Sequence, residues 1–395
     1  MFVYADHAAT TAMSAAARQA YLKAADTAWA NPSSLHTPGQ EAKVVLEEAR
    51  ETVARCLGAR PSEITFTSGG SEADNQAIRS AAALGAAKGR RHIITSAFEH
   101  HAVLHTLKRL EAEGFSVTYL PVHENGLVRA EEVAAAITPE TALVTVMTVN
   151  NEIGTIQPIR QIGELCRRAG VLFHTDAVQA VGHTAVDVEA DHIDLLSLSG
   201  HKFGGPKGVG ALYARRGIRL TSLIEGGAQE RSRRAGTENV PAIAGMAAAL
   251  AEAVGHLAEN TARTAALRDR LIEGLSAIPH SRLNGDRDAR VSGIVNFCFE
   301  GIEGESLLLL LDAEGIAASS GSACTSGSLD PSHVLLALGL PHEVAHGSLR
   351  LSIGADNTPE EIEHILKTVP RVVDYLRDMS PVWEELETGV RPHII

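Results

Sequence analysis

Short apolar runs alternate with longer stretches of helical spacing between about residue 60 and residue 215. The runs are rich in β-branched and aromatic residues, and the stretches between them, such as "IRQIGELCRRAG", repeat apolar residues at the α-helical period. The runs are "EITFTS", "RHIITS", "SVTYLPV", "ALVTVMTV", "VLFHTD", "IDLLSLS" and "VGALYA". This alternation predicts an α/β fold, in which a mostly parallel seven-stranded sheet is covered by helices on both faces.

The pattern changes after Pro241, where an Ala-rich helical stretch continues to about residue 277. It is followed by a strand ("GIVNFCFE"), a helix ("ESLLLLLDAEG"), a second strand ("SLRLSIG") and a long helix for which Thr358 is the predicted N-cap. This order predicts a smaller α+β domain. We place the large domain at residues 14–258 and the small domain at residues 1–13 and 259–395.

Length, charge and composition narrow the classes of function. At about 150 residues per domain, a chain of 395 residues is too long for a single compact core and is expected to form more than one domain. The net charge of −13 is spread along the chain, and no Lys- or Arg-rich run occurs, so nucleic acid is not expected as a partner. The longest apolar stretches are interrupted by charge or shorter than the ~20 residues that span a bilayer, which argues against membrane insertion.

The cysteines indicate a reducing compartment. Four of them occur without close spacing, and the N-terminus lacks a basic and apolar leader, so we expect a cytoplasmic protein with free thiols. Cys56, Cys166 and Cys298 lie within helical or strand patterns and are expected to pack in the fold. Cys324 differs, because it lies among small polar residues in "SSGSACTSGS".

Sheets of the predicted kind bind ligands at the carboxyl ends of their strands. In "LSLSGHKFGGPKGVG" a strand ends and Lys202 follows, between Ser199 and His201 on one side and a Gly-Gly-Pro loop on the other. A lysine in this setting suits Schiff-base chemistry, and an ordinary surface lysine is the alternative. In "VLFHTDAVQ" a second strand ends near Asp176 and Gln179. The aspartate either caps a loop or pairs with a protonated pyridine nitrogen.

A third strand is followed by Gly69 and Gly70 in "FTSGGSEADN", with Ser71 as the expected N-cap of an amphipathic helix. The free amides and the dipole of a helix start favour a phosphate group, and a plain tight turn is the alternative. Neither a Walker sequence nor a complete G-x-G-x-x-G follows any predicted strand, so a nucleotide is the less favoured ligand.

Together these stretches carry a family resemblance. The motifs are "SGGSE", "VNNEIG", "HTDAVQ", "SGHK", "RRAGTEN", "SSGSACTSGSLDPSHV" and "HGSLRLSIG", in this order. They resemble the NifS/IscS group of pyridoxal-phosphate cysteine desulfurases within the class V aminotransferase fold, and the likeness covers nearly the whole chain. The resemblance implies the type I fold of pyridoxal-phosphate-dependent transferases and a homodimer.

The resemblance also implies roles around the cofactor ring. Lys202 would form the Schiff base with the cofactor, and Asp176 would face the pyridine nitrogen. His100 of "FEHHAV" would stack over the ring as a catalytic residue, and Gln179 would contact the phenolic oxygen. The adjacent His101 takes the stacking role if the motif register is shifted by one residue.

Further implied roles concern the phosphate, the substrate and the sulfur. The phosphate would be held by Gly70, Ser71, Ser199, His201 and, from the partner subunit, Thr237. Ser71 stands where many relatives carry Thr, but it keeps the hydroxyl. Asn151 would contact both cofactor and substrate, and Arg350 would hold the substrate carboxylate through its bidentate fork.

Cys324 would be the nucleophile. In the implied reaction its thiolate attacks the sulfur of L-cysteine, which leaves a persulfide on the enzyme and releases alanine. A Gly- and Ser-rich loop at about residues 319–329 suits a thiol that has to move between the substrate and a sulfur acceptor. The implied acceptor is an iron–sulfur scaffold or another sulfur-acceptor protein. We expect no resident metal, and a contact of Cys324 with a nascent iron–sulfur cluster is left open.

Other activities compete with this interpretation. A selenocysteine lyase or an aminotransferase could use the same fold, and a scaffold or sulfur carrier could keep the fold without turnover. The segment "HEVAH" at residues 342–346 matches the H-E-x-x-H pattern of zinc proteases. Pro341 and Gly347 restrict it to less than two helical turns, which argues against zinc hydrolysis.

Overall fold

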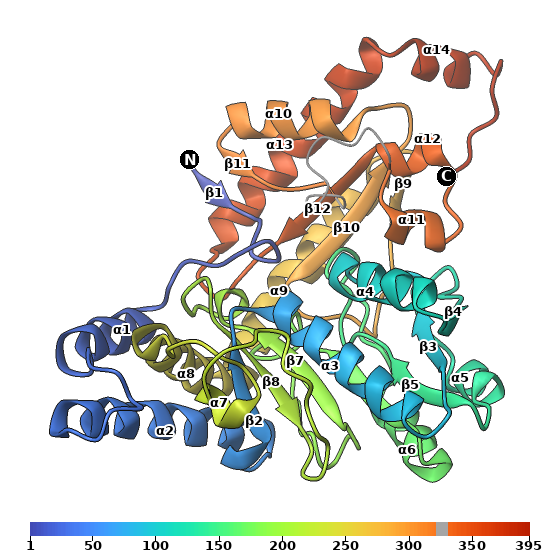
Figure 1. Cartoon of the computed structure of the whole chain (residues 1–395). Helices are drawn as coiled ribbons and strands as arrows, with labels where there is room; N and C mark the ends of the chain where they lie inside the picture. Colours follow the sequence, from blue (N-terminus) through green and yellow to red (C-terminus); the bar gives the residue numbers. More distant parts are fainter. Residues whose placement is uncertain (321–330) are drawn as a thin grey trace.

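A seven-stranded sheet forms the centre of the larger part of the molecule (Figure 1). The computed structural model describes residues 1–320 and 331–395. The strand order is β2-β8-β7-β6-β5-β3-β4, and β8 is antiparallel to both of its neighbours while the remaining pairs are parallel. The strands are β2 (Ile64–Thr67), β3 (His92–Ser96), β4 (Ser116–Leu120), β5 (Thr141–Thr145), β6 (Leu172–Asp176), β7 (Leu195–Ser199) and β8 (Gly210–Ala214). The predicted mostly parallel α/β sheet is confirmed.

Helices cover both faces of this sheet because its strands are apolar on both sides. Ile93 packs with α3 (Gly70–Ala86) and α4 (His101–Ala112), whereas the next residue, Ile94, belongs to the core that contains α6 (Ile159–Ala169) and α8 (Val240–Gly255). Successive side chains of a strand point to opposite faces, so these two cores lie on opposite sides of the sheet. The other helices of this part are α1 (Ala15–Thr27), α2 (Thr37–Leu57), η1 (Pro61–Glu63), α5 (Ala130–Ala136), η2 (Gly200–Lys202) and α7 (Gln229–Ser232).

A smaller antiparallel sheet of order β12-β10-β9 lies in the upper part of Figure 1. Its strands are β9 (Ser281–Leu283), β10 (Ile294–Phe299) and β12 (Ser348–Ser352), and β1 (Val3–Tyr4) pairs separately with β11 (Ile316–Ala317). Its core includes Phe297, Phe299 and Leu271. The helices are α9 (Leu257–Ser276), α10 (Gly304–Ala313), α11 (His333–Ala337), α12 (His342–His346), α13 (Pro359–Asp378) and α14 (Pro381–Glu387). Thr358 caps α13 as predicted, and the domain boundaries stay a prediction.

The Ala-rich stretch after Pro241 is two helices rather than the single long helix that the sequence suggested. α8 ends at Gly255 and α9 begins at Leu257, and their axes meet at an angle of 72°. Within the described ranges, no single helix has the length and apolarity needed to cross a membrane; α8 and α9 meet that criterion only when taken together.

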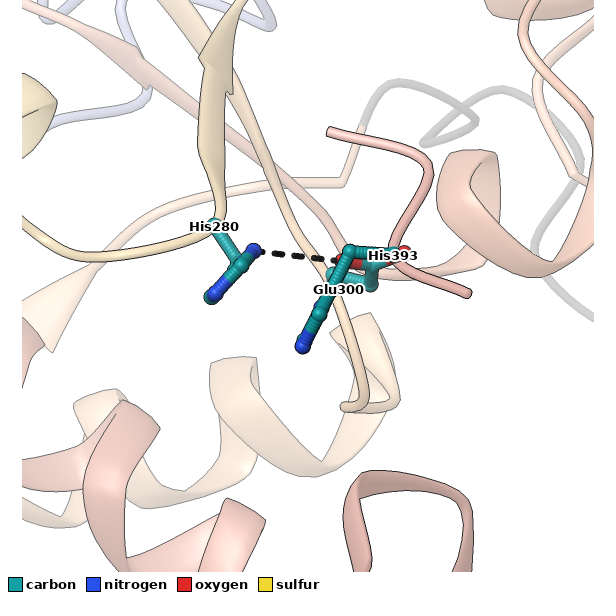
Figure 2. A group of neighbouring side chains, drawn as sticks. All are labelled: His280, Glu300 and His393. Carbon is teal, nitrogen blue, oxygen red and sulfur yellow. Dashed lines mark hydrogen bonds and ion pairs between the residues drawn. The ribbon is translucent and has the colours of Figure 1, made fainter. Parts of the chain in front are cut away.

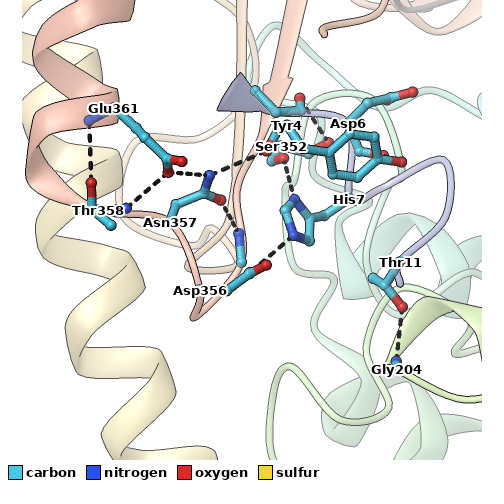
Figure 3. Close-up of polar contacts among 12 residues, drawn as sticks. Tyr4, Asp6, His7, Thr11, Gly204, Ser352, Asp356, Asn357, Thr358 and Glu361 are labelled. Atoms are coloured by element: carbon cyan, nitrogen blue, oxygen red, sulfur yellow. Dashed lines mark hydrogen bonds and ion pairs between the residues drawn. The ribbon is translucent and has the colours of Figure 1, made fainter. Parts of the chain in front are cut away.

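The N-terminal segment connects the two sheets (Figure 3). The imidazole of His7 lies 3.1 Å from the Ser352 carbonyl oxygen through Nδ1 and 3.1 Å from the Asp356 carboxylate through Nε2. A few residues later, the Thr11 hydroxyl accepts a hydrogen bond of 2.8 Å from the amide of Gly204, beside the end of the large sheet. The intervening backbone is thereby held against the carboxyl ends of β6 and β7.

Candidate active site

A cavity of about 370 Å³ lies where β6 and β7 end. It brings together residues from the N-terminal segment, both sheets and the start of α3. Its predicted site residues are Gly70, Ser71, His100, Asn151, Asp176, Gln179, Ser199, His201, Lys202 and Arg350. The rule that parallel α/β sheets bind ligands at their carboxyl edge therefore located the cavity correctly.

Lys202 ends η2, directly after β7, and its amine is held at the cavity by backbone oxygens. Nζ donates to the carbonyl oxygens of Ala8 at 2.6 Å and Ala9 at 2.8 Å. Gln179 donates to the same Ala8 oxygen at 2.8 Å. The N-terminal segment thus orients both the amine and the amide. A primary amine at this point can form a Schiff base with a carbonyl group in the cavity.

Asp176 is the last residue of β6 and is buried beside the same cavity, where its Oδ1 accepts a hydrogen bond of 2.9 Å from the amide of Val178. Burial raises the pKa of this carboxyl group, and the nearby imidazole of His100 acts in the opposite direction. A buried aspartate at this point can pair with a protonated ring nitrogen, which would replace the solvation that the carboxylate has lost.

His100 precedes α4 and caps it, because its Nδ1 accepts a hydrogen bond of 3.1 Å from the amide of Ala102. Its ring lines the cavity. The neighbouring His101 instead lies against His333, with ring centroids 4.6 Å apart, and does not line the cavity among the described residues. This placement favours the first histidine of the pair for the stacking role.

The start of α3 forms a second cavity of about 370 Å³ that shares Gly70, Ser71, Ser199 and His201 with the first and adds Lys207. The predicted N-cap is wrong by two residues. α3 begins at Gly70, and its N-cap is Gly69, at φ 154°, a conformation that only glycine adopts without strain. A Cβ at Gly70 would lie 2.5 Å from Cγ2 of Val178, so a side chain there would clash.

The electrostatics of this second cavity suit an anion. The first turn of a helix directs free amides and a positive dipole end toward a ligand. The ammonium of Lys207 adds a charge, while burial, aided by Lys202 and Lys207, lowers the pKa of His201 to about 4. His201 is therefore a neutral imidazole near pH 7, and its Nδ1 lies 3.1 Å from the Thr10 hydroxyl.

Arg350 on β12 is only 3 % exposed and reaches the opposite wall of the first cavity. Its terminal nitrogens donate to the carbonyl oxygen of Asn151 and to Asp6 Oδ1, each at 3.0 Å. Its Nε is buried and has no hydrogen-bond partner among residues 1–320 and 331–395. A buried, unpaired N–H of a guanidinium is costly unless a ligand accepts from it, and a carboxylate is the natural acceptor.

Two predicted site residues are not placed at the cavity. Thr237 is exposed and lines neither of the two cavities. Its predicted position in the partner subunit's site stays a prediction. Cys324 lies outside the described residues, and the segment that precedes it ends at Ser320 with Ser319 paired to Arg350 across their backbones.

Sequence reasoning missed three buried carboxyl groups near the site. Asp74 lines the cavity from the second turn of α3, and burial next to Asp176 raises its pKa well above the ordinary value. Burial raises the pKa of Glu99 to about 8 and that of Glu152 to about 7. The helical spacing between Ser71 and Asp74 could have indicated the first of these, because residues three apart share a helix face.

Comparisons with known proteins agree with this geometry. Residues 3–365 match the family model described as aminotransferase class-V. The chain is 53% identical over 386 residues to "Cysteine desulfurase IscS" of Clostridium botulinum (strain Hall), covering 97% of both chains. It is 53% identical over 380 residues to "Cysteine desulfurase IscS" of Methanosarcina thermophila, covering 96% of this chain and 94% of that one. A solved structure of a "NifS-like protein" superposes with a TM-score of 0.89 at 37% identity, covering 95% of this chain and 100% of the other.

The chain belongs to the class-V aminotransferase family, and its relatives within that family are cysteine desulfurases. Its cofactor is pyridoxal 5′-phosphate, on which this family depends. The residues present fit that group. The α3 cavity has the amides and positive charge that a phosphate needs, and the adjoining cavity places Lys202, Asp176 and His100 where a pyridine ring would meet them.

Proposed function

We propose that the protein converts L-cysteine to L-alanine and carries the released sulfur as a persulfide on Cys324. The observation that carries this proposal is Arg350. Its buried Nε has no hydrogen-bond partner in the part of the chain that the structure describes, and the residue lines the cavity that also contains Lys202 and Asp176. An amino acid that binds there through its carboxylate would place its α-carbon toward the lysine. The names of the relatives support cysteine as that amino acid.

Each side chain at the cavity has a separate role in the proposed reaction. Arg350 and Asn151 bind the substrate carboxylate, Lys202 is the attachment point of the cofactor, and His100 packs against the ring. When bound, pyridoxal phosphate supplies an electron sink for the charge left by loss of the α-proton. Asp176, held by its hydrogen bond to the Val178 amide, keeps a negative charge available at the ring nitrogen.

The sulfur transfer step balances without a further oxidant or reductant. The Cys324 thiolate attacks the sulfur of the substrate, so that an S–S bond forms and the C–S bond breaks. The electron pair of the broken bond stays on the substrate carbon, which takes up a proton and becomes the methyl group of alanine. The enzyme keeps the sulfur as a persulfide, and a second protein accepts it.

The biological setting belongs to the same proposal. We infer a cytoplasmic homodimer in which Thr237 of each subunit completes the phosphate site of the other, and which delivers sulfur to an iron–sulfur scaffold or another acceptor. Thr237 is exposed and lines neither cavity of its own chain, which supports this arrangement. Light scattering is expected to give about twice the chain mass of 41.7 kDa, whereas the chain mass itself would contradict it.

A selenocysteine lyase and an aminotransferase are the competing activities on this fold. Steady-state assays of the holoenzyme with L-cysteine, L-selenocysteine, and an amino acid paired with a keto acid separate the three. We expect alanine from L-cysteine, loss of that product in Cys324→Ala, and no net amino-group exchange. A native holoenzyme that forms alanine from L-selenocysteine but not from L-cysteine would favour the lyase.

A further inference from the structure

A second group of ligand-type side chains lies far from the active site, at the edge of the small sheet. Within residues 1–320 and 331–395, two groups of His, Cys, Asp and Glu side chains bring their ligand atoms within 4.8 Å of one another. One group, Asp74 with His100 and Asp176, belongs to the active site. The other consists of His280, Glu300 and His393 (Figure 2).

We propose that His280, Glu300 and His393 bind one divalent transition-metal ion, and that Zn²⁺ suits the site best. Two imidazoles and one carboxylate are a donor set that zinc uses in proteins. The sequence led us to expect no resident metal. The three residues are widely separated along the chain and match no ligand motif. The proposal does not depend on the activity of the enzyme.

The donor atoms lie close enough together to share one ion. The rings of His280 and His393 stack with centroids 3.6 Å apart, so one imidazole has to turn before both Nδ1 atoms face the same ion. Glu300 Oε2 lies 2.8 Å from His393 Nδ1 and 3.6 Å from His280 Nδ1. With bonds of about 2.0–2.1 Å, neighbouring ligands of a tetrahedral zinc ion lie about 3.3 Å apart, so the two observed distances bracket the required one. The oxygen of Ile395 accepts a hydrogen bond of 2.9 Å from His280 Nδ1, and it is a fourth ligand atom within reach once that nitrogen gives up its proton to bind the ion.

The surroundings hold these ligands in place. Arg377 donates to the backbone carbonyl oxygens of both Glu300 and His280, each at 3.1 Å, and its guanidinium lies 3.9 Å from the ring centre of Trp383. Trp383 in turn meets both histidine rings edge-on, at 5.5 and 5.6 Å. Supporting contacts of this kind orient metal ligands and raise affinity.

The burial of the Glu300 carboxylate and the partial exposure of the two histidines also favour a bound ion. The Glu300 side chain is 4 % exposed, so its charge is poorly hydrated, whereas the two histidine side chains are about one-third exposed and leave an entry path. A cavity of about 930 Å³ adjoins the carboxylate and is lined in part by Glu300, Arg391 and Ile394. Arg391, Pro392 and Ile394 line that cavity. A bound ion would therefore hold this C-terminal segment against the end of β10.

Metal binding is best measured on the holoenzyme in a Cys324→Ala background, because the catalytic thiol could itself bind zinc. Competition with a chromophoric zinc chelator at pH 7.5 gives the stoichiometry and the affinity. We expect one tight site per chain. His393→Asn keeps a hydrogen-bonding group beside Glu300 but removes the ligand, and it should weaken zinc binding at least about 100-fold. His393→Cys restores a ligand and should restore tight binding.

The matched control is His256→Ala. His256 is 3.6 Å from the carboxylate of Glu259 on an exposed surface and thus offers an imidazole beside a carboxylate without a second imidazole. Zinc binding should be unchanged in this variant. Equal binding in the parent, His393→Asn and His256→Ala, or no tight zinc in the parent, would overturn the proposal and leave the three residues as a hydrogen-bonded cluster.

Trp383 provides a second readout, because it contacts both histidine rings. The other tryptophan, Trp29, is 73 % exposed and can be replaced by phenylalanine. In Trp29→Phe, Co²⁺ is expected to quench the remaining tryptophan emission with saturation at one ion per chain. Adding His393→Asn should abolish the saturable quenching, and its persistence would contradict a site at this position.

Discussion

Arg350 and Asp6 form an ion pair in which a terminal nitrogen of the guanidinium lies 3.0 Å from the carboxylate oxygen. The Nε of the same guanidinium is buried, and none of the described residues forms a hydrogen bond with it. The pair joins β12 to the N-terminal segment, which also holds Lys202 through the carbonyl oxygens of Ala8 and Ala9. The guanidinium of Arg350 and the amine of Lys202 are thus positioned by one stretch of backbone.

Arg350→Lys keeps the charge but removes the planar fork, so substrate binding should suffer most. Hydrogen bonds between charged groups contribute about 1.5–3 kcal/mol, which corresponds to a fall in kcat/KM of about 10- to 150-fold for L-cysteine. Steady-state kinetics measure the effect. Arg263→Lys, on α9 and outside both described cavities, is the control and should leave kcat/KM unchanged. Equal kinetics in both variants would exclude Arg350 from the substrate site.

Asp176→Asn removes the buried charge but keeps an oxygen that can accept from the Val178 amide. We expect a loss of kcat of at least about 100-fold, because fixed charges aimed at a reacting group have effects of this size. The cofactor should stay bound, since the phosphate cavity is untouched. Alanine production and the cofactor content of the purified variant are the two measurements. A variant with full cofactor and full activity would show that the charge is dispensable.

Glu230→Gln tests a buried ion pair that fixes the loop before Thr237. Arg50 donates to Glu230 at 2.7 and 2.8 Å, and both side chains are nearly inaccessible. Glu230→Gln leaves the buried guanidinium with only the partly exposed Glu47 carboxylate beside it, which should cost about 3 kcal/mol of unfolding free energy. Glu47→Gln changes the other, 39 % exposed carboxylate beside the same arginine and should cost at most about 1 kcal/mol. Chemical denaturation that gives equal values for the two variants would contradict the account.

Glu99 should make stability depend on pH. Burial raises its pKa from 4.5 to about 8, so the folded protein holds a proton that the unfolded chain releases between these values. The stabilising effect of that proton is complete below pH 4.5 and is lost as the pH rises toward 8, by up to about 1.4 kcal/mol per pH unit. Glu99→Gln cannot titrate.

The unfolding free energy of the native protein should therefore fall relative to that of Glu99→Gln as the pH rises from 5 to 8. Denaturant titrations at several pH values measure the difference. Glu41→Gln, which changes an exposed carboxylate, is the control. Its unfolding free energy should depend on pH in the same way as that of the native protein. A constant offset between the native protein and Glu99→Gln would show that Glu99 is charged in the fold.

The strand-end residues were predictable because the geometry of a parallel sheet is local and regular. Lys202 and Asp176 each follow an apolar run, and adjacent parallel strands bring their ends together whatever the loops do. The helix start was misplaced for a physical reason. Ser71 is a good N-cap by residue type, but Gly69 takes a backbone conformation closed to serine, and the helix therefore begins one residue after it.

Contacts between segments distant in sequence were not predictable in this way. Asp6 meets Arg350 across 344 positions, and His393 meets Glu300 across 93. Neither pair has a spacing that a helix or a strand would impose, so no periodic pattern marks them. The bend between α8 and α9 was also missed, because residues of high helical propensity lie on both sides of it and Gly255 alone marks the break.

The most direct test of the central claim is alanine formation from L-cysteine by the purified holoenzyme with a thiol reductant, run beside Cys324→Ala. We expect stoichiometric alanine and sulfide from the native protein, and a loss of both in the variant, although the variant keeps its cofactor. If the native holoenzyme forms no alanine, or if Cys324→Ala forms it at the native rate, the proposed sulfur transfer through Cys324 is contradicted.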